Sequence, residues 1–162
     1  MSIIKPNNNT ISAITALPAA ITTGKVLQVI TATDQTDRTT TSTSFVTASN
    51  TLSVAITPSA TSSKMYIQLN STCHINTTNY ARYYTIYRDS TNLGNGDQGM
   101  TALYAENNAD PVVALNMGFL DSPNTTSQIT YQPYFRTGSS GQAAWLTWDQ
   151  TKSSMTVFEI AG

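Results

Sequence analysis

The 162-residue sequence predicts an all-β protein, a single antiparallel β-sandwich of the jelly-roll type that follows an extended N-terminal arm. Three observations support this fold class. Large apolar residues fall on every second position in several short runs, which is the period of a half-buried strand. Turn-forming residues separate these runs. No segment shows a convincing helical period, and roughly eight or nine short strands at regular spacing are typical of sandwiches and jelly rolls.

The first 23 residues differ from the rest and predict a docking arm, with the β-sandwich domain at residues 24–162. Pro6 and the asparagines at 7–9 interrupt any early element, and Pro18 stops a helix. A frayed terminus is the alternative, although disordered tails seldom carry so many isoleucines. The candidate partner-binding residues of the arm are its large aliphatic side chains, Ile3, Ile4, Ile11, Ile14, Leu17 and Ile21.

Three strands are expected between Gly24 and Ile75. They cover residues 25–32, residues 44–47 running on through 52–57, and residues 64–75. Pro58 ends the second of them because it has no N–H to give to a neighbouring strand. In the third, the alternation places Cys73 on the apolar face and His74 on the polar face. We therefore expect Cys73 in the core and His74 at the surface or at an interface.

The second half of the chain continues the pattern, beginning with a strand at residues 80–88. Residues 100–106 form a short strand or one helical turn, and the last two strands lie at 143–148 and 155–161. Residues 112–120 are apolar on both faces, which predicts a central strand. Pro133 lies inside the run at 128–137 and predicts an edge strand or a bulged strand. The expected core contains Val54, Ile56, Ile67, Leu69, Val157 and one face of residues 112–120.

The composition excludes several classes of function. The net charge is −1, charged residues make up 10%, and no basic run exists, so we expect no nucleic-acid partner. The single cysteine excludes a disulfide framework and a multi-cysteine zinc site. No apolar run has the length of a signal peptide or a membrane span, so we expect folding in a cytoplasm and no membrane partner. Such low charge favours a chain that is held in an assembly.

The chemically active residues do not form a recognisable catalytic set, so we expect no enzyme, no metal and no cofactor. His74 is the only histidine, and no G-x-S-x-G motif accompanies it. Asp34 and Asp37 share one loop and could help hold Ca²⁺, but Arg38 competes for their charge. Residues 94–99 match G-x-G-x-x-G without the βαβ context of a dinucleotide site, which predicts a hairpin loop.

The aromatic residues leave two functions open. Tyr80, Tyr83, Tyr84, Tyr87, Tyr104, Trp145 and Trp148 could stack on sugars, but tyrosines alternating along a strand also pack in sandwich cores and subunit interfaces. We favour the second interpretation. The strand at residues 80–88 supplies the candidate subunit-interface residues Tyr80, Arg82, Tyr84 and Arg88.

Several phrases of the sequence resemble a domain of virion structural proteins of tailed bacteriophages, above all those that infect cyanobacteria and marine bacteria. The phrases are GKVLQVITATDQTDRTTTSTSFV, LSVAITPSATSSKMYI, YYTIYRDSTNLG, FLDSPNTTSQITYQPYFRT and MTVFEIAG, in this order, and the likeness covers about residues 16–162. The resemblance implies a capsid-decoration or tail-fibre-like β-domain. It also implies a homotrimer, and it brings no catalytic residues.

A lone domain with an arm, without a coiled-coil stalk, favours a capsid decoration or cement protein on the outer surface of the virion. Its partners would be two further copies of itself and the major capsid protein or another virion protein, assembled in the host cytoplasm. A short tail fibre or fibre tip that attaches to the host surface is the alternative. A carbohydrate-binding module with a host-surface glycan as its ligand is the third hypothesis.

Overall fold

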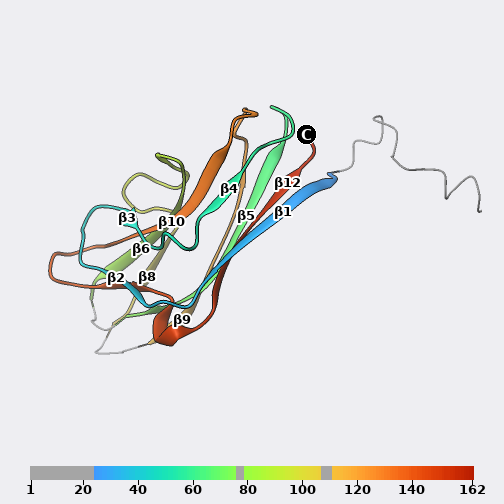
Figure 1. Cartoon of the computed structure of the whole chain (residues 1–162). Coiled ribbons are helices and arrows are strands. Elements are labelled where there is room, and N and C mark those ends of the chain that lie inside the picture. The colour runs from blue at the N-terminus through green and yellow to red at the C-terminus, as the bar shows by residue number, and fades with distance from the viewer. Residues whose placement is uncertain (1–23, 76–78, 107–110) are drawn as a thin grey trace, which may run out of the picture.

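The computed structural model describes residues 24–75, 79–106 and 111–162, and these residues form an all-β fold (Figure 1). Among them the only helical element is the 3-10 turn η1 (Trp148–Gln150), so no helix is long and apolar enough to span a membrane. The strands are β1 (Val26–Asp34), β2 (Arg38–Thr40), β3 (Val46–Thr47), β4 (Val54–Ile56), β5 (Lys64–His74), β6 (Ala81–Arg88), β7 (Thr91–Asn92), β8 (Thr101–Tyr104), β9 (Val112–Asp121), β10 (Ile129–Thr137), β11 (Ala144–Leu146) and β12 (Ser153–Ile160).

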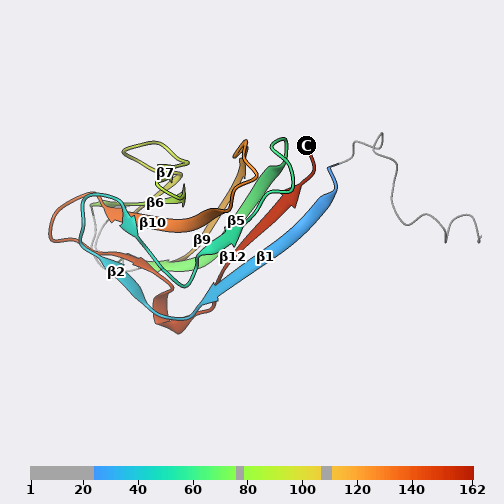
Figure 2. The same ribbon diagram turned by 45° about the horizontal axis from the view of Figure 1, so that its top comes forward.

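Two antiparallel sheets form the layers of a sandwich (Figure 2). The four-stranded sheet has the order β1-β12-β5-β9. In the six-stranded sheet β10 and β6 are central, β3 and β4 share the far side of β10, and β7 and β8 share the far side of β6. β2 and β11 pair as a separate ribbon. This strand order is that of a jelly roll, because in each sheet strands from the first six (β1 to β6) alternate with strands from the last six (β7 to β12).

The core lies between the two sheets, and the alternation read from the sequence fills it as predicted. Val54, Ile56, Ile67, Leu69 and Val157 are all buried. In β9, Leu115 and Met117 are buried while their neighbours Ala114 and Asn116 are exposed. Cys73 is buried as expected, and burial raises the pKa of its thiol to about 12. The thiol therefore stays protonated and unreactive at neutral pH.

The prediction that residues 112–120 form a central strand is wrong. β9 is the end strand of its sheet and pairs only with β5 in the described part of the chain. Its outer face is apolar because Val112 and Leu120 remain exposed there, not because a second layer covers them. A strand with two apolar faces can therefore be an edge strand whose outer face is free to contact a partner.

The prediction from Pro133 is also wrong, because β10 is a central strand with neighbours on both sides. The Pro133 carbonyl accepts a hydrogen bond of 2.9 Å from the Ala48 N–H, at the point where β3 has ended and β4 has not begun. The nitrogen of a strand residue points to the same side as its carbonyl. The nitrogen of Pro133, which has no hydrogen to donate, therefore faces the gap between the two short strands, where no ladder hydrogen bond is lost.

The remaining differences concern short elements. The run predicted at 44–57 is two short strands, β3 and β4, rather than one. Residues 100–106 contain the strand β8 and not a helical turn. Residues 94–99 form a loop between β7 and β8, and an antiparallel bridge between Asn95 and Gly99 gives this loop the form of a small hairpin. β2 was not expected, because its three polar residues carry no apolar alternation. The arm lies outside the described residues.

Candidate interaction surface

The outer face of the four-stranded sheet carries a row of large side chains that crosses all four strands. Val29, Phe158, Tyr66 and Leu120 are successive partners in the ladders that join β1, β12, β5 and β9. Val29, Tyr66 and Leu120 are 52%, 38% and 54% exposed. The rings of Tyr66 and Phe158 lie 6.1 Å apart. We call these four residues the apolar row.

Tyr66 also explains a glycine in the neighbouring strand. A Cβ atom at Gly118 would lie 2.9 Å from the Tyr66 hydroxyl oxygen, so the tyrosine ring occupies the space that a side chain on β9 would need. An aromatic ring placed over a glycine on a paired strand shields the exposed backbone from water. The apolar row is therefore packed within itself and is not a set of unrelated exposed residues.

The neighbouring row of this outer face is polar. The next row along the sheet consists of Thr31, Thr156, Gln68 and Gly118, and the hydroxyls of Thr31 and Thr156 are hydrogen-bonded at 2.9 Å. The apolar row thus lies at the end of the sheet where β1 begins. Gly24, where the arm joins the domain, is at the same end, since a Cβ there would meet the Ile160 side chain at 3.2 Å. Exposed apolar surface of this kind marks an interaction site.

An open groove runs along β9, on the side where the strand has no described partner. It encloses about 480 Å³. Its walls combine β9 with the loop that joins β7 to β8, and the residues that line it include Leu93, Asn95, Met100, Asn116, Met117 and Phe119. We call it the β9 groove. Its apolar walls and the unpaired strand edge beside it offer both side-chain and backbone contacts to an extended chain.

Two of the four candidate subunit-interface residues are internal, which corrects the prediction for them. Arg82 and Tyr84 are 0% and 1% exposed. Arg82 donates hydrogen bonds to the carbonyls of Tyr80 and Ala143, at 2.6 and 3.0 Å, and Tyr84 donates to the Trp145 carbonyl at 2.9 Å. The alternation in β6 was read correctly, but the face that carries these residues is turned toward the interior of the domain. Neither side chain can contact a second subunit.

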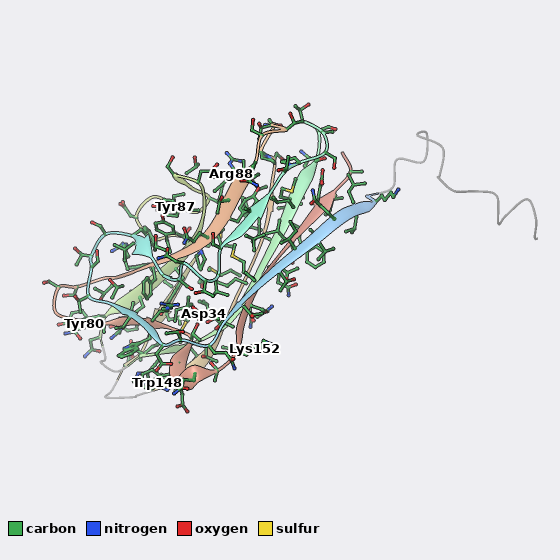
Figure 3. All side chains as sticks on the ribbon, in the orientation of Figure 1. Asp34, Tyr80, Tyr87, Arg88, Trp148 and Lys152 are labelled. Carbon is green, nitrogen blue, oxygen red and sulfur yellow. The ribbon has the colours of Figure 1, made fainter. Side chains whose placement is uncertain are left out.

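The other two candidate interface residues have different surroundings. Tyr80 is exposed and remains available to a partner. Arg88 pairs with Asp121 at 2.8 Å within the same chain, so its charge is already neutralised. Figure 3 shows Arg88 at one end of the sandwich and Trp148 at the other. The arm residues Ile3, Ile4, Ile11, Ile14, Leu17 and Ile21 lie outside the described residues.

Asp34 is occupied by groups of its own chain. The Arg38 guanidinium donates two hydrogen bonds to Asp34 Oδ2, at 3.0 and 2.9 Å, and Ser49 Oγ donates to the same oxygen at 2.6 Å. Burial alone would raise the pKa of Asp34, but the hydrogen bonds from Ser49, Thr36 and Arg38 outweigh it and lower the pKa below its ordinary value. Arg38 thus takes the place that a cation would need, and the described residues contain no cluster of three metal-ligating side chains.

Glu159 is buried, and among the described residues it has no cationic partner. Its carboxylate accepts hydrogen bonds from the Ser59 N–H, from Ser63 Oγ and from Gln28 Nε2, each at 2.6 Å. Burial raises the pKa of this carboxyl, but these donors, together with Ser59 Oγ, lower it further than burial raises it. The carboxylate joins β1, β12 and the loop before β5. Its role is structural, since four hydrogen bonds hold the carboxylate between these elements.

The prediction of a surface or interface His74 is wrong within the domain itself, because His74 is buried. Its ring stacks on Trp148 at 3.9 Å, and Trp148 meets Trp145 edge-on at 4.9 Å. The chain around η1 folds back over the end of β5, and Thr147, Asp149 and Gln150 take left-handed backbone conformations to achieve this. The alternation in β5 could not predict that residues more than 70 positions away would cover His74.

A second candidate surface lies on the outer face of the six-stranded sheet. Tyr87 and Tyr134 are stacked at 3.9 Å, and the Arg136 guanidinium lies 4.1 Å from the centre of the Tyr83 ring. Phe45 contacts the same arginine. We call these five residues the tyrosine patch, and an open hollow of about 410 Å³ adjoins it. Stacked rings next to a cation resemble the sugar platforms considered from the sequence, although the rings here pack mostly on one another.

The fold and the surfaces together define this chain as an all-β sandwich protein of jelly-roll topology. Its described part presents apolar and aromatic surfaces.

Comparison with protein-family models and with curated proteins gives no match. The similar solved structures include chains from three infectious bursal disease virus structures: the T13 viral particle (14% identity, TM-score 0.48), the VP2 subviral particle (18%, 0.45) and the Gx strain (14%, 0.48).

These likenesses cover 83%, 83% and 85% of this chain but only 31%, 33% and 33% of the viral chains. The protein therefore spans about a third of the length of the chains that it resembles. With identities below 20% and TM-scores below 0.5, the likenesses carry no conclusion about function.

Proposed function

We propose that this protein is a non-enzymatic structural component of a bacteriophage virion, a decoration or cement protein that docks on the head through residues 1–23. One observation carries the proposal: the buried carboxylates of the domain have hydrogen-bond partners within the chain, whereas a row of large apolar side chains remains exposed. Asp34, Asp121 and Glu159 are satisfied inside the fold, whereas the apolar row stays exposed where the arm begins. The resemblance of residues 16–162 to virion proteins supports the same role.

The energetics of the surface favour an assembled protein. A fully buried Val, Leu or Tyr side chain contributes roughly 1.5–3 kcal/mol relative to the exposed state. Val29, Tyr66 and Leu120 leave about half of this contribution unused in the single chain, because they are 38–54% exposed. Charged residues make up only 10% of the sequence, so electrostatic repulsion between copies does little to prevent association through this surface. A partner on the virion would cover it.

The arm supplies an anchor whose affinity depends on its backbone as well as its side chains. Each buried isoleucine contributes roughly 1.5–3 kcal/mol, while ordering about twenty residues costs roughly 1–2 kcal/mol for each residue. Side-chain burial alone therefore does not offset the loss of entropy. Backbone hydrogen bonds to a partner, as in strand addition, must contribute.

A short tail fibre or fibre tip is the second candidate function, and the tyrosine patch is the observation that favours it. Three tyrosines and Arg136 on one outer sheet face could bind a host-surface glycan. The decoration role is preferred because the rings of Tyr87 and Tyr134 already cover each other.

The two roles differ in where the protein sits. Purified protein carrying an electron-dense or fluorescent label is added to particles that lack it, and cryo-electron microscopy locates the bound copies. We expect density on the head lattice. Density confined to the tail would replace the decoration role by the fibre role, and no binding to any part of the particle would refute both.

A further inference from the structure

β9 presents an edge without the features that usually prevent strand addition. Its register with β5 is unbroken from Met65–Asp121 to His74–Val112. The strand contains no Lys, Arg or Pro, the residues with which natural edges are commonly protected. The opposite edge differs, since β1 has an irregular register between Val26 and Gln28, and Gln28 Nε2 donates to the Thr57 carbonyl at 2.9 Å.

The β9 groove gives this edge room for side chains. In a strand added to β9, every second side chain would point toward the space between the sheets, beside Met117 and Phe119. Leu93 and Met100 form the facing wall. The other side chains would lie on the outer face, next to Asn116 and Leu120. The edge therefore fits an extended segment that is apolar on both faces and carries no charge.

We propose that the β9 edge binds residues 10–17 of a second copy of this chain as an added strand. This segment, TISAITAL, has no charge and no proline, and Pro18 follows it at once. In an extended strand Ile11 and Leu17 fall on one face and Ile14 falls on the other. Eight residues at about 3.3 Å each span about 26 Å, and the ten residues of β9 span about 33 Å, so the whole segment fits along the edge.

The place where the arm leaves the domain favours the second copy as its source, because the chain's own β9 edge lies on the far side of its sheet. The arm joins at Gly24, ahead of β1, and β1 and β9 are opposite edges of the same sheet (Figure 2). Three strand spacings, about 14 Å, separate them. In a head-to-tail ring the β1 edge of one copy faces the β9 edge of the next, so residues 18–23 need only cross from one to the other. Such a ring closes at three copies in the homotrimer that the resemblance implies.

The inference deepens the proposed function and rests on its assignment of residues 1–23 as the docking arm. It divides that arm into two parts, which Pro6 and residues 7–9 separate. Residues 10–17 bind the neighbouring copy and hold the ring together. Ile3 and Ile4 remain for the head surface.

Cysteine cross-linking of the full-length chain tests the strand addition. Ser12, Ile14 and Ala16 share one face of an extended strand, and each is replaced singly by cysteine in a chain that also carries Asn116→Cys on the exposed face of β9. Facing residues on paired strands bring their Cβ atoms to about 4.5–5.5 Å, close to disulfide distance. The buried Cys73 does not compete, because it is inaccessible and protonated. The matched control carries Thr156→Cys on β12, about 14 Å from an added strand.

After mild oxidation we expect disulfide-linked multimers on non-reducing gels for at least one arm position paired with Asn116→Cys, at more than five times the yield of the Thr156→Cys control. Monomers with an internal disulfide would overturn the choice of a second copy. Equal yields for the two acceptor positions, or no cross-link from any arm position, would overturn strand addition. Because no phage particle is present, these failures are distinct from a failure of head docking, which the particle assay measures separately.

Discussion

Arg88 of β6 donates from one guanidinium nitrogen to both carboxylate oxygens of Asp121 in β9, at 2.9 and 2.8 Å. The two strands belong to different sheets, so this ion pair connects the layers of the sandwich. Tyr131 Oη donates to the same carboxylate at 2.7 Å. Burial first, and then the hydrogen bond and the charge of Asp121, raise the pKa of Tyr131, which keeps its hydroxyl protonated as a donor. The arrangement fixes the end of β9 next to Leu120.

Replacing Asp121 should destabilise the domain. Asp121→Ala leaves the Arg88 guanidinium and the Tyr131 hydroxyl without their acceptor, and we expect the free energy of unfolding to fall by about 2 kcal/mol. Arg88 is partly exposed, which keeps the loss below that of a fully buried pair. Urea denaturation measures it. Asp97→Ala removes an exposed carboxylate and serves as the control, and equal stability of the two variants would contradict the structural role of the pair.

Glu159 should make stability depend on pH in the acidic range. Its pKa in the folded protein lies below the ordinary value of 4.5. The stabilisation it supplies is therefore present above about pH 4.5 and is lost as the pH falls through the folded-state pKa. We expect Glu159→Gln to lower the free energy of unfolding at pH 7 by about 1–3 kcal/mol, since the amide cannot accept all the hydrogen bonds.

Below pH 4.5 the difference between wild type and Glu159→Gln should shrink, because the wild-type carboxyl then becomes protonated as well. Urea titrations at pH 7 and at several lower values test this. Asp34 also has a lowered pKa, so some acid dependence remains in the variant. A stability difference that stays constant down to pH 3 would show that the hydrogen-bonded carboxylate is not responsible.

The sequence predicted the fold class because burial follows the parity of residues within a strand. Ile67, Leu69 and Val157 entered the core on this basis alone. Parity does not say which face is the inner one when both faces carry mixed residues. For this reason Arg82 and Tyr84 were assigned to an interface, although their face of β6 is the buried one.

The sequence did not show which strands would pair with each other. The edge position of β9 and the central position of β10 depend on pairings between residues far apart in the chain. The apolar row has the same origin. Val29, Tyr66 and Leu120 are unremarkable residues in three separate strands, and only the register places them in a line with Phe158.

The apolar row should affect assembly more than folding. Tyr66 and Leu120 are about half-buried in the single chain, so we expect Tyr66→Ser with Leu120→Ser to reduce the free energy of unfolding by about 1.5–3 kcal/mol, which leaves the domain folded. If the row is covered in the homotrimer, the double variant should dissociate at concentrations where the wild type is trimeric. Multi-angle light scattering at micromolar concentration measures the mass, with Thr156→Ser as the control. A wild-type protein that is monomeric under these conditions would refute the trimer.

The tyrosine patch separates the decoration role from the fibre role. For a decoration protein we expect no saturable binding of host-surface polysaccharide, because the stacked rings of Tyr87 and Tyr134 leave little free aromatic face. Isothermal titration with polysaccharide purified from the host provides the measurement. Saturable binding that Tyr83→Ala or Arg136→Ala weakens tenfold, while the exposed control Tyr104→Ala does not, would favour the fibre tip instead.

Deleting residues 2–21 should leave a folded β-domain that no longer binds the virion. The described strands begin at Val26, and Leu52, Ile67 and Val157 belong to a buried cluster made of described residues. We therefore expect a far-ultraviolet circular dichroism spectrum of the β type and a thermal midpoint within about 4 °C of the wild type, which corresponds to about 1 kcal/mol for a domain of this size. Replacement of residues 7–9 by serine is the matched control, because it alters the arm but keeps its six large aliphatic side chains. Wild-type occupancy of particles by the deletion variant would show that the arm is not the anchor, and failure of the variant to fold would place the arm in the core of the domain.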